Sequence, residues 1–226
     1  MIDQLHEVQI KILRELLFKP VARFSDLNVT DLTNDHFTFH IKRLVELGLV
    51  EKLNEQYTLS KSGKEYANRL DTDQLKLERQ AKVSLAIICV DQSRILMQQR
   101  LKQPYYGYYG VVTGKVRWGE TVLETAGREL AEETGLSAKL EVTGVEHKMD
   151  YDQAGKLLED KFFFLIKAVK PIGKLIENFE GGRNIWFSEK EVQKLPDLFD
   201  DMLDLIRMVQ GDNFGLREMK YKVKSY

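Results

Sequence analysis

The segment from Gly114 to Leu136, GKVRWGETVLETAGRELAEETGL, constrains the fold and the chemistry of this chain more than any other stretch. Three of its five glutamates, Glu129, Glu132 and Glu133, are spaced three and four residues apart. On a helix these positions fall within about 100° of arc, so the three carboxylates converge on one face. Carboxylates this close repel one another, and a bound divalent cation removes the conflict. Oxygen ligands without histidine or cysteine favour Mg²⁺ or Mn²⁺ over zinc.

The same helix has an apolar side, which indicates how it packs. The stripe consists of Val122, Leu123, Ala126 and Leu130. Glu133 falls at the edge of this stripe, whereas a glutamate present only for solubility is expected opposite the core. Gly127 costs about 1 kcal/mol relative to alanine in a helix interior, so we expect a close approach by a neighbouring strand or loop there. Gly135 is expected to end the helix. The alternative interpretation is a solvated, charged helix face without a metal.

The spacing of the fixed residues resembles that of one known family. Gly114 is followed after five residues by Glu120, and seven further residues lead to a run that reads RELAEETGL from Arg128 to Leu136. This is the complete pattern G-x5-E-x7-R-E-U-x-E-E-x-G-U, with U apolar, that is typical of Nudix hydrolases. One departure lies just before it, because many members have Pro-Gly where this chain has Val112 and Thr113.

The resemblance implies a fold, a reaction and a set of site residues. The fold is of the α/β (α+β) class, an α/β/α sandwich with a mixed sheet. The reaction is Mg²⁺-dependent hydrolysis of the diphosphate linkage in a nucleoside diphosphate derivative, with Mn²⁺ as the alternative ion. The metal ligands are Glu129, Glu132 and Glu133. Arg128 pairs with Glu120 and braces the preceding loop against the helix, while Gly114 and Lys115 belong to the loop that shapes the substrate pocket.

Further candidates lie outside this segment, and each has a structural alternative. Many family members recruit one more acidic residue from a later loop, where this chain offers Glu177 and Glu180, with Glu180 the better positional match. Glu159 and Asp160, before the run KFFFLI, are weaker candidates. A cluster of tyrosines could stack on a nucleobase, although covering a sheet edge is the stronger interpretation: Tyr105, Tyr106, Tyr108 and Tyr109. Arg100 and Lys102 could steer phosphate or belong to a solvated surface. His147 is expected to be structural, and Cys89, in an apolar run, to be buried and inert.

The first 70 or so residues have a different pattern. Three helices, a short hairpin that turns at Asn54 and Glu55, and a closing helix are similar to bacterial and archaeal winged-helix regulators. In the stretch TFHIKRLVELG, four residues repeat at helical spacing and are expected in the core: Phe37, Ile41, Leu44 and Val45. Four others would then face double-stranded DNA: Thr38, His40, Lys42 and Arg43. Because acidic and basic residues balance here, a module for dimerisation or ligand communication remains the alternative.

Together these patterns predict a winged helix-turn-helix domain over residues 1–72, a linker over 73–80, a Nudix domain over 81–210 and a C-terminal tail over 211–226. The 226-residue chain has a net charge of −1. Its overall charge is therefore too small to attract it to nucleic acid or to a membrane surface by long-range electrostatics. The start lacks the features of a signal peptide, so a cytoplasmic location is expected. A homodimer is compatible with both domain types. The main functional alternative is a transcriptional regulator whose Nudix domain senses a nucleotide-type ligand.

Overall fold

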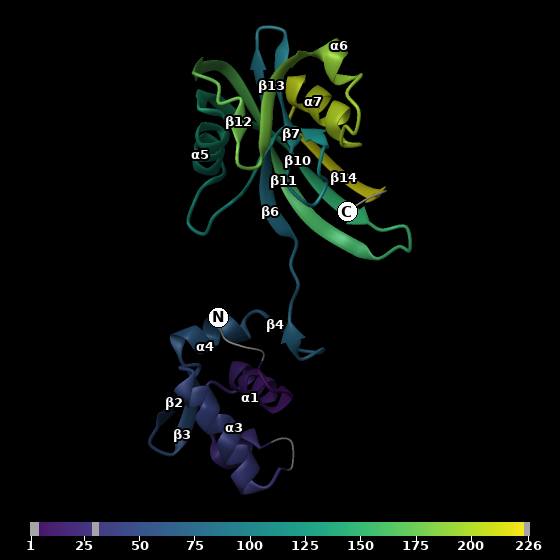
Figure 1. Ribbon diagram of the computed structural model, residues 1–226. Helices are drawn as coiled ribbons and strands as arrows, with labels where there is room; N and C mark the ends of the chain where they lie inside the picture. The colour runs from purple at the N-terminus through teal and green to yellow at the C-terminus, as the bar shows by residue number, and fades with distance from the viewer. Residues whose placement is uncertain (1–4, 29–31, 224–226) are drawn as a thin grey trace. The chain divides into compact units, whose positions relative to one another are not determined.

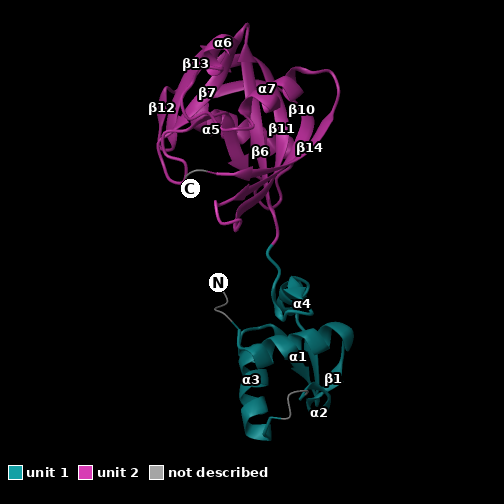
Figure 2. Cartoon of the chain, turned by 90° about the vertical axis from the view of Figure 1, so that its right-hand side faces the viewer, with its two compact units in different colours: residues 1–79 teal, residues 80–226 magenta. Residues whose placement is uncertain are grey.

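The computed structural model describes residues 5–28 and 32–223 of the chain and divides it into two compact units, Met1–Arg79 and Gln80–Tyr226 (Figures 1 and 2). The expected linker over 73–80 contains ordered structure instead. Strand β5 (Lys76–Leu77) pairs antiparallel with β4 (Leu70–Asp71), so this segment forms half of a short hairpin. A run of charged residues without a core pattern gave no sign of that pairing.

Unit 1 contains the series of elements that the sequence predicts. Before the β4–β5 hairpin its elements are α1 (Glu7–Phe18), β1 (Ala22–Arg23), α2 (Phe24–Leu27), α3 (Asn34–Glu46), β2 (Val50–Leu53), β3 (Gln56–Leu59) and α4 (Lys61–Ala67). The three strands form an antiparallel sheet in the order β1-β3-β2. Asn54 adopts a positive φ of 56° in the turn between β2 and β3, a conformation that asparagine tolerates better than most residues.

The core of unit 1 agrees with the predicted helical spacing except at one position. Phe37, Ile41 and Leu44 of α3 are buried, but Val45 is exposed. Val45 lies about 100° around the helix from Leu44, which takes it beyond the edge of the buried stripe. The structure instead buries Leu49 and Val50, which follow α3, so the chain after the helix completes the core.

Unit 2 is a mixed sheet covered by helices. Its elements are β6 (Lys82–Asp91), β7 (Arg94–Arg100), β8 (Tyr109–Gly110), β9 (Val112–Lys115), α5 (Val122–Thr134), β10 (Leu136–Tyr151), β11 (Leu157–Gly173), β12 (Asn178–Phe179), β13 (Gly182–Ser188), α6 (Glu189–Val192), α7 (Met202–Gln210) and β14 (Gly215–Lys222). The strand order is β12-β13-β7-β6-β11-β10-β14, while β8 pairs with β7 and β9 with β6. The pairs β6–β11 and β10–β14 are parallel and the others antiparallel, so the predicted mixed sheet is confirmed.

Two helices cover opposite faces of this sheet (Figure 1). Successive side chains of a strand point to opposite faces, and β6 shows the consequence. Ala86 and Ile88 pack in a core with α7, whereas Leu85, Ile87 and Cys89 pack in a second core with α5. Cys89 is buried, as predicted, and burial together with the charge of Asp91 raises the pKa of its thiol to about 12. The predicted α/β/α arrangement is therefore present.

The C-terminal segment that the sequence analysis set aside as a tail is part of the sheet. Strand β14 runs parallel to β10 from the pair Gly144–Gly215 to the pair Tyr151–Lys222. A Cβ on Gly144 would lie 2.6 Å from the carbonyl oxygen of Gly215, so the two backbones approach too closely for a side chain. Residues 224–226 of that segment lie outside the described residues.

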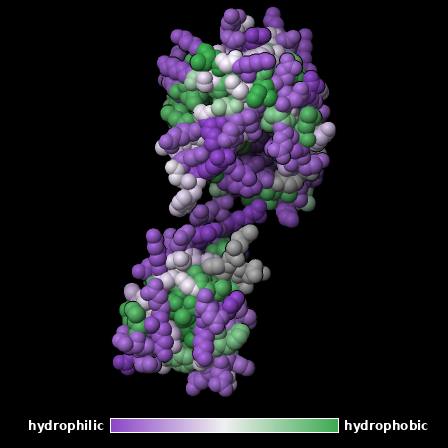
Figure 3. Space-filling model, turned by 60° about the vertical axis from the view of Figure 1, so that its left-hand side comes forward, coloured by the Kyte–Doolittle hydropathy of each residue, from purple (hydrophilic) through white to green (hydrophobic). Residues whose placement is uncertain are grey.

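On the face that Figure 3 shows, both units are mostly hydrophilic, with hydrophobic areas between the polar side chains. Leu123 belongs to the exposed set, although the sequence placed it in the apolar stripe of α5. Ala126 and Leu130 are fully buried, as predicted. Thr125 and Thr134 take the remaining buried positions of α5, so its buried side is rotated away from Leu123. In the described part of the chain, no helix is both long enough and apolar enough to cross a membrane.

Candidate functional site

Helix α5 is fixed at both ends by its own sequence. At its start, Thr121 Oγ1 accepts a hydrogen bond from the Glu124 backbone N–H at 3.3 Å, and Glu124 Oε2 accepts one from the Thr121 backbone N–H at 2.8 Å. This reciprocal arrangement satisfies two backbone donors that have no partner inside the helix. At its end, Gly135 adopts a left-handed φ of 71°, which confirms the predicted stop. The positions of the glutamates on α5 are therefore set locally.

Arg128 ties the preceding loop to the helix. Its Nε donates to Glu120 Oε1 at 2.8 Å and its Nη2 donates to Glu120 Oε2 at 2.9 Å. Thr125 Oγ1 also donates to Glu120, at 2.8 Å. The hydrogen bond from Arg128 is the main cause that lowers the pKa of Glu120 to about 2. A two-point contact between guanidinium and carboxylate fixes direction as well as distance, so the pairing that the resemblance implied is present.

Glu129 lies directly against Gly114 of β9. A Cβ built on Gly114 would lie 2.2 Å from Glu129 Cγ and 2.7 Å from its Oε1, so only glycine leaves room for this side chain. Glu129 Oε1 also accepts a hydrogen bond from Arg128 Nη1 at 2.7 Å, and its side chain is largely buried. The absence of a side chain at Gly114 therefore leaves the volume that the Glu129 side chain occupies. Lys115, the next residue, is exposed and does not line the pocket described below.

No such close contact explains Gly127. A Cβ there would meet only Leu140 Cδ1, at 3.9 Å, which is an ordinary van der Waals distance. The expected approach of a strand or loop to Gly127 is therefore wrong.

Glu132 is the most exposed of the three candidate ligands, with 52% of its side chain accessible. Its Oε2 lies 3.2 Å from Arg128 Nη1 and 3.7 Å from Arg117 Nη2. Within residues 5–28 and 32–223, no three acidic, histidine or cysteine side chains are gathered as a metal cluster. The carboxylates of Glu129, Glu132 and Glu133 nevertheless fit a hard divalent cation, because they offer oxygen ligands alone. Positive charge is already next to them, since the guanidinium groups of Arg117 and Arg128 pair with these glutamates. Binding of the ion would exchange part of that arginine pairing for metal ligation.

Glu133 is held by a polar network that the sequence analysis missed. Gln98 Nε2 donates to Glu133 Oε2 at 3.0 Å and to Asn184 Oδ1 at 3.1 Å. Asn184 Nδ2 in turn donates to the backbone oxygen of Glu133 at 2.7 Å. Burial raises the pKa of Glu133, and the hydrogen bond from Gln98 opposes that shift. The sequence carried little signal for this network, because Gln98 stands beside Gln99 and Arg100, and Asn184 follows Arg183, so neither is an isolated polar residue in an apolar run.

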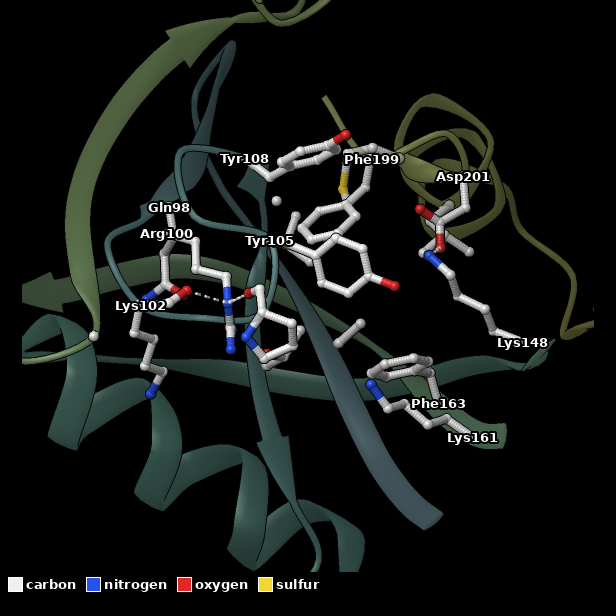
Figure 4. Close-up of a pocket in the computed structure, with 18 of the residues that line it drawn as sticks. Gln98, Arg100, Lys102, Tyr105, Tyr108, Lys148, Lys161, Phe163, Phe199 and Asp201 are labelled. Carbon is white, nitrogen blue, oxygen red and sulfur yellow. Dashed lines mark hydrogen bonds and ion pairs between the residues drawn. The ribbon is translucent and has the colours of Figure 1, made fainter. Parts of the chain in front are cut away.

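A pocket of about 190 Å³ opens beside Glu133 (Figure 4). Arg100 and Lys102, the two candidates for steering phosphate, both line it. Burial lowers the pKa of Arg100, although Glu133 opposes the shift. Of the four tyrosines, Tyr105 and Tyr108 line the pocket, whereas Tyr106 is exposed and Tyr109 packs against Phe187. Tyr105 and Tyr108 are therefore placed where they could contact a ligand, and the interpretation as cover for a sheet edge does not apply to these two.

The remaining acidic candidates lie in different surroundings. Glu180 is exposed in the turn between β12 and β13, next to Gly181, which lines the pocket. Glu177 is exposed just before β12. Asp160 accepts from His147 Nε2 at 2.8 Å, and Glu159 pairs with Lys82 and Lys161, so both belong to pairs on the sheet. His147 also contacts Glu218 and stacks on Phe162 with 4.1 Å between the ring centres, which agrees with a structural role.

The predicted DNA-facing side of α3 is only partly exposed. Lys42 and Arg43 are exposed, and Arg43 pairs with Glu46 at 3.2 Å. Thr38 is half-buried. His40 does not point outward as predicted, because its ring stacks on His6, with 4.6 Å between ring centres, and its Nδ1 is buried. Burial lowers the pKa of His40, which reduces its positive charge. The neighbouring Phe39 is exposed instead.

Comparisons with known proteins agree with this geometry. A sequence model of the NUDIX domain matches residues 79–208. Among curated proteins, an ADP-ribose pyrophosphatase of Methanocaldococcus jannaschii is 31% identical over 111 residues, which cover 47% of this chain and 66% of the relative, just under two thirds of its length.

Solved structures are similar to the same part of the chain. A MutT protein from Bacillus halodurans has a TM-score of 0.56 at 27% identity, over 64% of this chain and 93% of that one. The NUDIX domain of Shewanella oneidensis NrtR, solved with ADP ribose, has a TM-score of 0.52 at 19% identity, over 67% and 97%. These likenesses establish the fold of unit 2.

Proposed function

The chain belongs to the NUDIX family, and on that premise we propose that it hydrolyses the diphosphate linkage of a nucleoside diphosphate derivative of the ADP-ribose class. The observation that carries the proposal is the arrangement on α5, where Glu129 lies against Gly114 and Glu133 lines the adjoining pocket. The relative named as an ADP-ribose pyrophosphatase supports the substrate class.

The proposal gives each side chain around α5 a task. Glu129, Glu132 and Glu133 would hold Mg²⁺ or Mn²⁺, which when bound polarises the phosphate and activates the attacking water. Arg128 orients Glu129, and Gln98 orients Glu133, through the hydrogen bonds described above. Fixing ligands through a surrounding layer of hydrogen bonds is how proteins tune metal sites.

The pocket supplies the positive charge that a diphosphate requires. Arg100 and Lys102 line it on the same side as Glu133, and their charges act on that carboxylate. A diphosphate bound between these cations and α5 would place its linkage next to the glutamates. Glu133 is largely enclosed by protein, so charge interactions with its carboxylate are stronger than in bulk solvent. Glu180, in the turn beside Gly181, is the proposed additional acidic residue.

The test is Mg²⁺-dependent product release from a panel that contains ADP-ribose, NADH, nucleoside triphosphates and diadenosine polyphosphates. Glu132→Gln is expected to abolish turnover without a loss of thermal stability, because the side chain is half exposed. Glu141→Gln, an exposed glutamate on β10, is the matched control and should retain activity. Hydrolysis of none of these compounds, or full activity in Glu132→Gln, contradicts the proposal.

A second candidate function rests on unit 1. Its order of helices, three-stranded antiparallel sheet and closing helix supports a winged helix-turn-helix, and Lys42 and Arg43 give α3 an exposed basic pair. We propose that this unit binds double-stranded DNA, which would make the chain a regulator that responds to its nucleotide ligand. The NrtR domain, whose structure contains ADP ribose, shares the fold of unit 2.

The DNA proposal is tested by binding to the sequence upstream of the chain's own gene over a range of salt concentrations. Phosphate contacts make affinity fall with salt, so the slope reports how many are made. The double variant Lys42→Ala, Arg43→Ala should weaken binding and reduce that slope. Lys61→Ala with Lys64→Ala, on α4, is a control of equal charge change. Equal affinity for all three proteins would reject α3 as the DNA-facing helix.

A further inference from the structure

Arg117 lies in the turn that joins β9 to α5, and its backbone has a fixed position. The Glu120 backbone N–H donates to the Arg117 carbonyl oxygen at 3.0 Å, and Gly119 between them has a left-handed φ of 87°. A four-residue turn with glycine at its third position has this geometry. Because Arg128 holds the Glu120 side chain, the turn is tied to α5, and Arg117 is kept next to that helix.

The side chain of Arg117, unlike its backbone, is held loosely. It is 59% exposed and pairs only distantly with Glu132, with 3.7 Å between Nη2 and Oε2. Arg128, in contrast, is 16% exposed and makes hydrogen bonds of 2.7–2.9 Å to Glu120 and Glu129. Pairs between exposed charges contribute little to stability. Arg117 can therefore leave Glu132 when a stronger partner arrives, whereas Arg128 is committed to its contacts.

Glu133 and Glu132 mark the enclosed and the exposed side of the candidate metal site. Glu133 lines the pocket, where the charges of Arg100 and Lys102 act on it. Glu132 is 52% exposed and has Arg117 beside it. Positive charge from two separate segments of the chain therefore flanks the site, and Arg117 supplies it on the side that faces solvent.

A cation beside a metal ligand opposes binding of the metal. An ion that binds Glu132 has to displace the Arg117 guanidinium and is then repelled by its charge, so Arg117 lowers the affinity of the site for the ion alone. An anion that arrives with the ion reverses the sign, because a guanidinium donates two parallel N–H groups to phosphate oxygens. Arg117 thus disfavours the bare ion and favours the ion together with a diphosphate.

We propose that Arg117 leaves Glu132 when the divalent ion binds and donates to a phosphate oxygen of the diphosphate on the exposed side of the site. The proposal rests on the proposed function, which supplies the diphosphate, and it adds Arg117 to the residues that bind the substrate. Arg100 and Lys102 would hold the diphosphate from the pocket, and Arg117 from the opposite segment, so the linkage is fixed between them.

Two binding measurements on the full chain have opposite expected signs in Arg117→Gln. Affinity for Mn²⁺ alone should rise about twofold to fivefold, because an exposed competing charge is removed. Affinity for adenosine 5′-(α,β-methylene)diphosphate at saturating Mn²⁺ should fall about tenfold, because a hydrogen bond between charged groups is lost. Arg94→Gln is the matched control: Arg94 is 50% exposed, pairs with Asp91 at 3.0 Å and should change neither affinity when replaced.

The opposite signs separate substrate binding from a structural role. A residue that only shapes the turn would lower both affinities on replacement, and one that only repels the ion would raise both. Either result, unchanged affinities in Arg117→Gln, or a wild-type chain that binds neither ligand at millimolar concentration overturns the proposal. Arg117→Lys keeps the charge without the two-point contact, so it should bind Mn²⁺ as the wild type does and lose part of the affinity for the analogue. That variant carries the test if Arg117→Gln does not fold.

Kinetics distinguish this inference from the proposed function. With ADP-ribose and saturating Mg²⁺, Arg117→Gln should raise KM about tenfold, and an unchanged KM overturns the contact while leaving the hydrolase assignment intact. A wild-type chain that hydrolyses none of the compounds in the panel, but whose Arg117→Gln variant shows the two opposite changes in affinity, would refute the proposed function and leave the Arg117 contact standing.

Discussion

Replacing Gly114 with alanine should damage the site while leaving the fold intact. The added Cβ would lie 2.2 Å from Glu129 Cγ and 2.4 Å from its Cδ. Carbon atoms in contact are about 3.5–4.0 Å apart, so the Glu129 side chain has to move by more than about 1 Å. That movement takes its carboxylate away from Arg128 Nη1, now 2.7 Å distant.

The size of the effect follows from that displacement. A misplacement of about 1 Å in a catalytic group costs about 100-fold in rate, so kcat/KM for ADP-ribose should fall about 100-fold. Stability should change little, because the φ angle of Gly114 is not in the left-handed region and a flexible side chain absorbs the clash. Steady-state kinetics with ADP-ribose and thermal unfolding measure the two quantities separately.

Gly127 provides the matched control within α5. Its added Cβ meets only Leu140 Cδ1 at 3.9 Å, so alanine fits without movement. Glycine in a helix interior costs about 1 kcal/mol relative to alanine, so Gly127→Ala should raise the melting temperature of unit 2 by about 2–4 °C and leave kcat/KM unchanged. The reasoning is refuted if Gly114→Ala retains wild-type kcat/KM, or if the two variants lose activity equally.

Three further predictions concern the surroundings of α5 and the buried charges. Gln98→Leu should lower kcat about tenfold by releasing Glu133, and Gln99→Leu, one residue along β7, should not; equal effects would contradict the role of Gln98. Arg128→Lys cannot reproduce the two-point contact with Glu120, so kcat/KM should fall about tenfold, and unchanged kinetics would argue against the brace. Burial, with the charge of Asp201, raises the pKa of Glu146 above 4.5, so the stabilising protonated form is lost as pH rises through that raised value. Glu146→Gln should therefore gain stability relative to wild type as pH increases above 4.5, and a difference in melting temperature that does not depend on pH would contradict this.

The sequence predicted the helix and its surroundings because both are encoded locally. The bounds of α5 follow from residues within four positions of each end, and the pairing of Arg128 with Glu120 follows from a fixed spacing. The alternation of β6 between two cores is also visible in its uninterrupted apolar run, which is typical of a strand buried on both faces.

What the sequence did not reveal depends on contacts between distant segments. Gln98 and Asn184 are 86 positions apart, and only the pairing of β7 with β13 brings them to Glu133. Strand β14 lies at the edge of the sheet and is rich in charge, so its sequence resembles a solvated tail. His40 has a polar side chain, yet the N-terminal end of α1 covers it. Helical periodicity gives the direction of a side chain, but it does not say which element lies there.

Release of AMP from ADP-ribose as a function of Mg²⁺ concentration tests the central claim most directly. With a chelator present, the account predicts no release; with added Mg²⁺ it predicts a rate that rises to saturation, and Glu129→Gln should remove that rise. Release that proceeds equally with the chelator, or none at any Mg²⁺ concentration, would contradict the assignment of the α5 carboxylates as the metal site of a diphosphate hydrolase.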